Sequence, residues 1–444
     1  MSKNNKKTIH IIGAGPAGMA TSYYANKNNL NSIIYESSDD VGGNCKTLKE
    51  GNFLFDLGAH RLHDKNYEVT RAIKELLDKD LLEVNSPSKI FWKDKFFNFP
   101  LQITDILFKL NFKTKSKIIF ENIVNKLSSK IEFNSFEDVA YNNYGKTISN
   151  LFLTNYTKKL WGRSCNELLP EISGGRLKNL NIRSILKEFI FNKKLKSQHL
   201  DGKFLYPRYG YGTIFETIKN MNGLHKIHLN SPITKLLHNN KKINKIIYHN
   251  KEVSVEHLVS TLPINLLIKM LDPIADNHIL EKIDSISYRG LKLCAIFLDV
   301  ERCSDNASIY FPSKNIPFTR LYEPKNRSNY MAPKNQTCIV IEIPYNQNLN
   351  RNNDDYFMDM VIEILIDKKI IKRKNILFSK LIDMPFAYPI LTLDVKEKIS
   401  CLLEYLKRFK NLNNFGRNAE FKYLHTHDLF NSANHLIKSI KNQI

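Results

Sequence analysis

The chain has 444 residues, 42% of them hydrophobic, so it can bury a large core and we expect about two or three domains. Its formal charge of +22 suits an anionic partner, but the lysines are spread through every segment without interleaved aromatic residues, which disfavours nucleic-acid binding. No apolar run approaches the roughly 20 residues of a membrane-spanning helix, and the first residues lack the apolar stretch of a signal peptide, so we expect a cytoplasmic protein.

The first expected element is an apolar strand over residues 9–12, followed at once by a glycine-rich loop. Gly13, Gly15 and Gly18 have the spacing G-x-G-x-x-G. In a strand–loop–helix unit, the first glycine allows a tight turn, and the second lets the backbone approach a pyrophosphate. The third lets the helix lie close to the strand. This pattern predicts a dinucleotide-binding site.

The segment that follows supports the same interpretation. Pro16 and Ala17 suit the first turn of a helix, whose N-terminal N–H groups attract phosphate. A second strand over residues 33–35 ends at Glu36, which is placed to accept hydrogen bonds from an adenosine ribose. An acid at this position disfavours the 2′-phosphate of NADP but does not separate NAD from FAD.

A second glycine element separates these two cofactors. Residues 41–47, which include Gly43 and Asn44, and residues 55–60, which end at His60, resemble the second glycine element and the D-x-G element of FAD enzymes in the amine oxidase group. The resemblance implies that the cofactor is FAD.

Helical periodicity replaces the strand pattern in the second quarter of the chain. A strand pair is expected over residues 90–92 and 96–99, and helices from about residue 101 to residue 191. Lysines decorate this helical region at positions 109, 113, 115, 117, 126 and 130. Such a face is either simply solvated or an interfacial membrane helix, so weak association with a membrane surface stays open.

The remaining elements return to strands and end in a helix. Strands are expected over residues 227–237, 243–249 and 252–258, and in a substrate sheet that includes residues 294–300 and 338–343. An amphipathic helix is expected over about 429–440. Six scattered cysteines without a C-x-x-C pair predict free thiols and argue against a zinc site.

We therefore expect an α/β fold, with a Rossmann-type FAD-binding domain, a helical insertion domain and a mixed β-sheet substrate domain. The FAD-binding domain would be assembled from three separated pieces. The expected boundaries are residues 1–85 for its first part, 86–203 for the mainly helical domain, 204–280 for its second part, 281–385 for the substrate domain and 386–444 for its third part.

Seven short motifs, in the same order along the chain, resemble those of UDP-galactopyranose mutases. They are residues 58–63 (Gly-Ala-His-Arg-Leu-His), 156–162 with Leu169-Pro170 and Arg176, 206–211 (Tyr-Pro-Arg-Tyr-Gly-Tyr), Tyr288-Arg289, 318–323 (Phe-Thr-Arg-Leu-Tyr-Glu), 387–390 (Ala-Tyr-Pro-Ile), and Gly416-Arg417 with Lys422-Tyr423. The resemblance spans nearly the whole chain.

The mutase resemblance also implies a reaction. In the mutases, reduced flavin attacks the anomeric carbon of the sugar and UDP departs. The covalently held sugar opens and recloses at another hydroxyl, with no net redox change. A departing diphosphate needs cations and phenol donors, and arginine suits the task because its planar fork holds two oxygens at once.

The resemblance assigns three overlapping sets of residues, and no metal. The implied catalytic residues are His60, His63, Arg176, Arg289, Tyr388 and Tyr423. The implied substrate-binding residues are Tyr156, Trp161, Arg176, Tyr211, Arg289, Tyr388 and Tyr423. Arg417 and Asp428 join Gly13, Gly15, Pro16, Ala17, Gly18, Glu36, Gly43, Asn44 and His60 as implied cofactor-binding residues.

The departures from the mutase pattern leave the substrate open. Asn179, Leu180 and Asn181 occupy the region of a second mutase arginine, and Phe421 replaces a tyrosine. The pattern is nearer to a sister branch, labelled amine oxidase-like or protoporphyrinogen oxidase-like, that is associated with bacterial surface polysaccharides. The leading expectation is an FAD enzyme for a nucleotide-sugar or another anionic small molecule.

Two alternatives remain at this point. The first is an FAD oxidoreductase that acts on an amine, a carotenoid-like lipid or a porphyrin-like ring. The second is a catalytically idle flavoprotein that binds partners in glycan assembly. A homodimer is left open.

Overall fold

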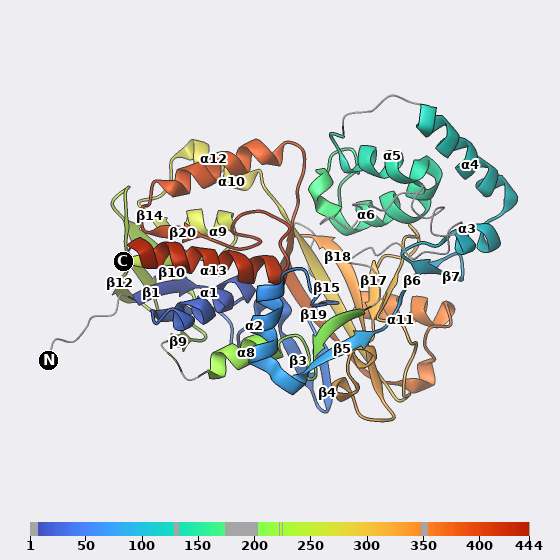
Figure 1. Cartoon of the computed structure of the whole chain (residues 1–444), viewed down its shortest axis with the longest axis horizontal. Coiled ribbons are helices and arrows are strands. Elements are labelled where there is room, and N and C mark those ends of the chain that lie inside the picture. Colours follow the sequence, from blue (N-terminus) through green and yellow to red (C-terminus); the bar gives the residue numbers. More distant parts are fainter. Residues whose placement is uncertain are drawn as a thin grey trace.

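Figure 1 shows the computed structural model, which describes residues 8–127, 133–173, 203–221, 223, 225–347 and 354–443. A nucleotide-binding unit, a large mixed sheet and a group of helices lie side by side, and pieces far apart in sequence build the first of these units. The predicted α/β architecture is confirmed. Arg176 lies outside the described residues.

A five-stranded parallel sheet forms the centre of the nucleotide-binding unit, in the order β20-β13-β1-β2-β9. Its strands are β1 (Thr8–Ile12), β2 (Asn31–Tyr35), β9 (His225–His228), β13 (His257–Ser260) and β20 (Leu412–Asn414). Four consecutive residues of β1 are buried, as expected of a parallel strand that is covered on both faces.

Helices gathered from the whole chain cover this sheet. They are α1 (Pro16–Lys27), α2 (Tyr67–Leu77), α8 (Thr213–Asn220), α9 (Ile264–Lys269), α10 (Asn277–Asp284), α12 (Val395–Lys407) and α13 (Thr426–Gln443). The C-terminal helix α13 lies along α1 (Figure 1) and buries Leu429, Ala433, Ile437 and Ile440, which follow a helical period. The predicted final amphipathic helix is confirmed, with an extra turn before Leu429.

Smaller sheets complete this unit and correct two expected strands. A four-stranded sheet contains β10 (Ile233–His238), β11 (Ile243–Tyr248), β12 (Lys251–Ser254) and β14 (Leu271–Asp272). Two antiparallel pairs are the hairpin of β3 (Thr47–Glu50) with β4 (Phe53–Asp56) and the long-range pair of β5 (Leu81–Asn85) with β8 (Lys203–Pro207). The strand expected over 227–237 is broken at Asn230, which has φ of 50°. The strand expected over 252–258 is also two strands, because β12 pairs with β11 whereas β13 joins the parallel sheet.

The large sheet has seven strands in the order β19-β15-β18-β17-β16-β6-β7. They are β6 (Ser88–Trp92), β7 (Lys95–Phe99), β15 (Tyr288–Leu298), β16 (Ser308–Tyr310), β17 (Arg320–Tyr322), β18 (Thr337–Asn346) and β19 (Ile376–Pro389). All eleven residues of β15 are buried, because one face packs beneath α11 (Asp354–Asp367) and the other packs against β4. The hairpin β6–β7 is as predicted, but it pairs with β16 and so belongs to this sheet, whereas the expected boundary placed it with the helices.

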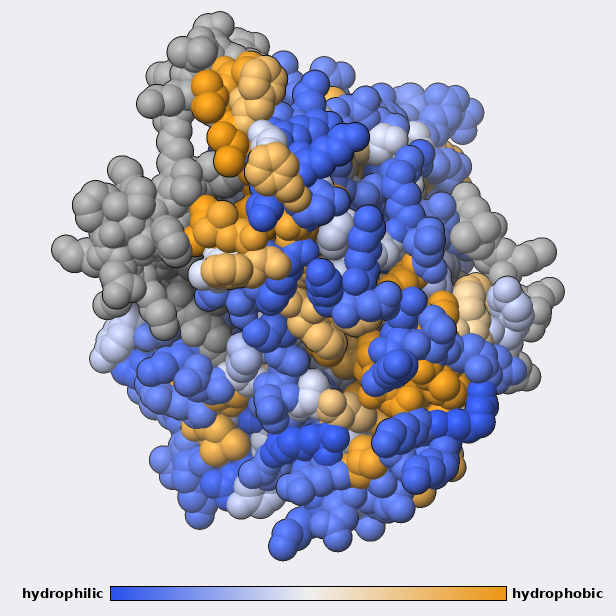
Figure 2. Space-filling model, turned by 90° about the vertical axis from the view of Figure 1, so that its right-hand side faces the viewer, coloured by the Kyte–Doolittle hydropathy of each residue, from blue (hydrophilic) through white to orange (hydrophobic). Residues whose placement is uncertain are grey.

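The helical group contains α3 (Ile103–Lys109), α4 (Phe112–Leu127), α5 (Phe136–Ile148), a π-helical segment (Ser149–Leu153) and α6 (Thr154–Trp161). Helix α5 begins with a capping box between Ser135 and Asp138, and α6 ends at Gly162 in the left-handed conformation, with φ of 67°. The outward face of this group, turned to the viewer in Figure 2, carries both hydrophobic and hydrophilic patches. Over the described residues, no helix has the length and apolar character needed to cross a bilayer.

Candidate active site

The three glycines of the loop after β1 have different steric surroundings. Gly13 has φ of +96°, and a Cβ there would lie 2.4 Å from Oγ1 of Thr261. A Cβ on Gly18 would lie 1.9 Å from the carbonyl oxygen of Gly13, so this glycine lets α1 approach the loop. A Cβ on Gly15 would meet nothing within 4 Å. The space above Gly15 is thus left open for a ligand.

That open space is part of a cavity of about 480 Å³ at the carboxyl ends of the parallel strands. Predicted cofactor residues that line it are Gly13, Gly15, Pro16, Ala17, Glu36, Gly43, Asn44, His60 and Arg417. Gly18 is not among the lining residues, since it packs the helix against the loop. The donor set and the bare glycine backbone fit a dinucleotide such as FAD.

Glu36 is held in a fixed position at the end of β2. Its carboxylate accepts hydrogen bonds from the backbone N–H of Ala14 at 2.6 Å, the N–H of Ser38 at 2.9 Å and the hydroxyl of Ser38 at 2.8 Å. The side chain is buried but borders the cavity. A rigid carboxylate at this edge of the cavity is compatible with the predicted contact to a ribose, which stays a prediction.

Asp428 has a different position from the one expected of a cofactor contact. It lies in the first turn of α13, where its Oδ2 accepts the backbone N–H of His425 at 2.8 Å, and its Oδ1 lies 3.1 Å from Nε2 of His427. These two contacts help to lower the pKa of Asp428 to about 2, against the opposing effect of burial. Asp428 is not among the residues that line the cavity, and it stabilises the start of the helix.

His60 lies between the cofactor cavity and an adjoining cleft. Its Nε2 is 2.9 Å from the carbonyl oxygen of Asn44, so Nε2 is the nitrogen that donates, and Nδ1 faces the thiol of Cys45 at 3.9 Å. Burial lowers the pKa of His60 to about 3 and raises that of Cys45 to about 12. Both groups are therefore neutral near pH 7.

The adjoining cleft has a cationic wall. It shares Asn44, Cys45, His60, Arg417 and Thr426 with the cofactor cavity, and it adds the basic side chains Arg61, His63, Lys65, Arg320, His425 and His427. Glu342 is the one carboxylate among the described residues that line the cleft, and Arg320 holds it by hydrogen bonds of 2.9 and 2.6 Å. Basic side chains thus outnumber carboxylates among the described residues that line this wall, and an anion fits it.

Arg417 stands at the junction of the two spaces. Its Nε donates to the carbonyl oxygen of Leu424 at 2.8 Å, and Nη2 donates to the same oxygen. The guanidinium lies over the ring of Tyr423 at 5.1 Å and over that of Tyr388 at 6.0 Å. The predicted residues Tyr388, Tyr423 and Arg417 therefore form one group beside the cleft.

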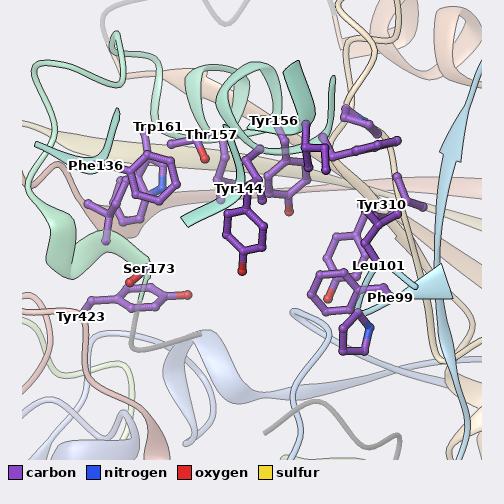
Figure 3. Close-up of a pocket in the computed structure, with 18 residues that line it drawn as sticks. Phe99, Leu101, Phe136, Tyr144, Tyr156, Thr157, Trp161, Ser173, Tyr310 and Tyr423 are labelled. Atoms are coloured by element: carbon purple, nitrogen blue, oxygen red, sulfur yellow. The ribbon is translucent and has the colours of Figure 1, made fainter. Parts of the chain in front are cut away.

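An aromatic pocket of about 160 Å³ opens on the far side of the cleft, between the helical group and the large sheet. It shares Phe99, Tyr156, Leu160, Tyr310 and Tyr423 with the cleft. In Figure 3, Trp161 and Phe136 stand on one side of the pocket and Tyr310, Phe99 and Leu101 on the other. Tyr144 and Tyr423 direct their hydroxyl groups into the space between.

Other predicted site residues lie in two different spaces. Tyr156 and Trp161 line the aromatic pocket, and His63 and Tyr211 line the cleft. Trp161 also contacts the rings of Tyr388 and Tyr423, at centroid distances of 5.6 and 5.8 Å. Tyr211 is buried against His60.

Arg289 is not placed among the residues that line these spaces. Its guanidinium donates to the carbonyl oxygens of Leu160 at 2.9 Å and Lys159 at 3.0 Å, and to the side-chain oxygen of Asn346. The first two acceptors belong to the C-terminal turn of α6, where a cation is favourable. Arg289 therefore ties α6 to the large sheet.

Lys159 makes a second link between these two units. Its ammonium lies within 3.0 Å of four carbonyl oxygens, those of Phe311, Ser313, Ile316 and Phe318, in the loop between β16 and β17. Burial lowers the pKa of Lys159 to about 7, while the four oxygens favour the charged form. The loop that precedes Arg320 is thus fixed against α6.

The family model for flavin-containing amine oxidoreductases matches residues 16–343. The chain belongs to this family. Its cofactor is FAD, as the sequence predicted, and it is an enzyme of the flavin-dependent class. Over the described residues, no three His, Cys, Asp or Glu side chains form a group that could hold a metal ion.

Individual relatives are distant. A Klebsiella pneumoniae protein named "Probable UDP-galactopyranose mutase" is 25% identical over 219 residues, which cover 48% of this chain and 53% of that protein. Chloroplastic protoporphyrinogen oxidase of Nicotiana tabacum is 29% identical over 100 residues, 22% of this chain and 18% of that protein. The matches thus span about half of one relative and about a fifth of the other.

Among solved structures, reduced UDP-galactopyranose mutase superposes with a TM-score of 0.84 over 99% of this chain and 96% of that one, at 18% sequence identity. This likeness shows that the two proteins share a fold.

Several lining residues were missed by the sequence analysis. Arg320 was noticed within a motif but given no role, and Tyr310, Arg61 and Glu342 were not singled out. A signal existed for Arg61, which sits between the two histidines of the predicted flavin loop. For Glu342 there was none, because its partner is set by the register of β17 on β18.

Proposed function

We propose that this FAD enzyme rearranges the sugar of a nucleotide-sugar, as in the mutase reaction, for the synthesis of a surface polysaccharide. One observation carries the proposal. The cofactor cavity, the cationic cleft and the aromatic pocket form a continuous series in that order, joined by shared lining residues. A nucleotide-sugar laid along this series would have its sugar at the junction with the flavin, its diphosphate in the cationic cleft and its base in the aromatic pocket.

The proposed roles follow from the chemistry of each space. Arg417 and Arg61 would hold the diphosphate, because a guanidinium makes charge-assisted hydrogen bonds to two phosphate oxygens at once. Tyr388 and Tyr423 would donate phenol hydrogens to the departing group. When bound and reduced, FAD supplies the electron-rich nitrogen that the mutase reaction requires.

The aromatic pocket would bind the base. Trp161 and Tyr156 present ring faces for stacking, and the hydroxyl groups of Tyr144 and Tyr423 can bond to polar edges of a base or ribose. His60 would act as a neutral group beside the flavin, since its pKa of about 3 keeps it uncharged.

A separate observation supports a second candidate function. The aromatic pocket is lined mainly by apolar side chains, including Ile90, Leu101, Ile148, Phe152 and Leu153, and it could take an apolar chain or ring. This favours the alternative of a net oxidoreductase of the amine oxidase or protoporphyrinogen oxidase type. Such an enzyme would consume oxygen or another acceptor during turnover.

One assay separates the candidates. The purified flavoprotein is reduced with dithionite and offered UDP-galactofuranose and related nucleotide-sugars, and isomers are sought by chromatography. Isomer formed only with reduced flavin supports the proposal. Oxygen uptake with an amine or an apolar ring, and no isomer, would support the oxidoreductase; bound FAD without turnover of either kind would indicate an idle flavoprotein.

The two tryptophans of the chain allow a direct test of the base site. Trp161 lines the aromatic pocket, whereas Trp92 lies in β6 and does not line it. In Trp92→Phe the remaining tryptophan should be quenched by UDP, and in the matched Trp161→Phe variant the emission should not change. Equal responses in both variants would place the base elsewhere.

A further inference from the structure

The outer surface of the helical group exposes large apolar side chains. Phe108 at the end of α3 is 82% exposed, and on α4 the exposed fractions are 80% for Phe112, 61% for Ile119, 67% for Phe120 and 55% for Ile123. We call these five residues the α4 face. Hydrophobic side chains gather on this side of the molecule in Figure 2.

The spacing along α4 shows that this exposure is organised. Phe112, Ile119, Phe120 and Ile123 recur at intervals that place them on one side of an α-helix. Ile118 points the other way and is buried in the cluster beneath α3, α4 and α5. The helix thus has one apolar side for the fold and a second apolar side that the described chain leaves uncovered.

Basic residues flank the α4 face. On the helical period, Lys113 and Lys117 fall at one edge of the apolar side and Lys115 at the other. The nearby acids are engaged inside the protein. Asp105 accepts from Lys109 and from the backbone of Asn98.

The carboxylate of Glu121 accepts from the backbone N–H and the hydroxyl of Thr147 at 2.7 and 2.8 Å, and it also lies 4.0 Å from the ammonium of Lys117, which leaves the charges of Lys113 and Lys115 in excess. The charge that faces outward around the apolar side chains is therefore positive. An apolar helix side with lysines at its edges is the pattern of a helix that lies in the plane of a membrane surface.

We propose that the α4 face docks on the surface of an anionic phospholipid bilayer. The phenylalanines would enter the boundary between headgroups and acyl chains, and the lysines would bind lipid phosphates. Charge complementarity favours this occupant over a second copy of the chain. A two-fold contact would bring the same lysine-edged surface against itself.

Docking would also place the aromatic pocket near the bilayer. Phe99, Pro100 and Leu101 line that pocket, and α3 begins two residues later at Ile103. A substrate whose apolar part is dissolved in the membrane would then be available at the pocket. The proposal does not depend on the nucleotide-sugar reaction.

Cosedimentation of the FAD-loaded protein with vesicles tests this inference. Vesicles of phosphatidylcholine alone are compared with vesicles of equal parts phosphatidylcholine and phosphatidylglycerol. We expect binding to the second kind, weakened by high salt. Phe112→Ser with Phe120→Ser should lower the partition coefficient by about tenfold or more, and Lys113→Glu with Lys117→Glu by a similar factor.

Matched control variants change similar residues elsewhere. Tyr67 and Ile274 are 73% and 69% exposed and lie outside the helical group, so Tyr67→Ser with Ile274→Ser should leave binding within about twofold. Lys396→Glu with Lys407→Glu on α12 removes the same net charge as the α4 lysine variant. The flavin absorbance and thermal melting of each variant verify that it is folded.

Several results would overturn the proposal. They are equal binding to both kinds of vesicle, no binding to either, or α4 variants that bind as well as the controls. A chain that is dimeric by light scattering and becomes monomeric in Phe112→Ser with Phe120→Ser would show that a second copy covers the face. Loss of vesicle binding with unchanged turnover of soluble substrate would leave the proposed reaction intact.

Discussion

Gly15 and Gly18 belong to the same loop, yet the structure predicts opposite results when each is replaced by alanine. The backbone at Gly15 has φ of −69° and ψ of −179°, which alanine adopts without strain, and the added methyl group would meet no protein atom within 4 Å. At Gly18 the methyl group would lie 1.9 Å from the carbonyl oxygen of Gly13 and 3.3 Å from Cγ2 of Ile11.

The magnitudes follow from these contacts. Gly15→Ala should leave the stability of the flavin-free protein unchanged or raise it by about 0.4–1 kcal/mol, because alanine restricts the unfolded chain. The methyl group would occupy ligand space, and forcing the pyrophosphate to shift should cost about 1–3 kcal/mol, or about a 5- to 150-fold weaker FAD affinity. Gly18→Ala must push α1 away from the loop and should destabilise the fold by about 3 kcal/mol.

The assay uses both variants and the parent protein after removal of the flavin. Urea denaturation followed by tryptophan emission measures stability, and calorimetric titration with FAD measures affinity. We expect the Gly15→Ala variant to be stable but to bind FAD poorly, and the Gly18→Ala variant to unfold at a lower urea concentration. If Gly15→Ala binds FAD like the parent, or Gly18→Ala keeps its stability, the roles inferred from the backbone geometry are wrong.

Arg417→Gln should weaken UDP binding in calorimetry by about 10- to 150-fold, because it removes a charge-assisted contact, whereas Arg289→Gln should leave UDP affinity within about twofold and lower the melting temperature. If UDP affinity falls in Arg289→Gln but not in Arg417→Gln, the diphosphate binds at Arg289. Glu342→Gln leaves the partly buried Arg320 without its carboxylate partner and should reduce the free energy of unfolding in urea by about 1.5–3 kcal/mol; an unchanged midpoint would refute this. The pKa of His60 is 6.5 in the unfolded chain and about 3 in the native protein, so the unfolded chain binds more protons between these two pH values. The free energy of unfolding therefore falls as the pH falls from 6.5 to 3. In His60→Gln, the urea midpoint should drop less between pH 7 and pH 4.5 than it does in the parent protein. An equal drop in both proteins would contradict this.

The nucleotide-binding part of the site was predictable because its chemistry is local. Gly13, Gly15 and Glu36 lie within one strand–helix–strand unit, and their spacing alone fixes where each must stand. Asp428 was assigned to the cofactor, but its position three residues after His425 is also the spacing of a helix cap, and the structure shows the cap.

The rest of the site depends on contacts between distant segments. The strand pattern over residues 90–92 and 96–99 predicts a strand pair but not the sheet edge that it joins, and this edge brings Phe99 beside Tyr310. The sequence motifs assigned Arg289 to catalysis and substrate binding and Arg417 to the cofactor. Only the packing of α6 against β15 separates an arginine that binds helix carbonyls from one that faces the cleft.

The four carbonyl oxygens around the ammonium of Lys159 limit how this enzyme can admit its substrate. If the helical group moved away from the large sheet, the ammonium of Lys159 would lose all four carbonyl acceptors at once, and no other described contact would replace them. Entry by a hinged, jaw-like separation is therefore disfavoured. Rotation of individual rings at the rim, such as that of Tyr423, is the less costly way to widen the passage toward the flavin.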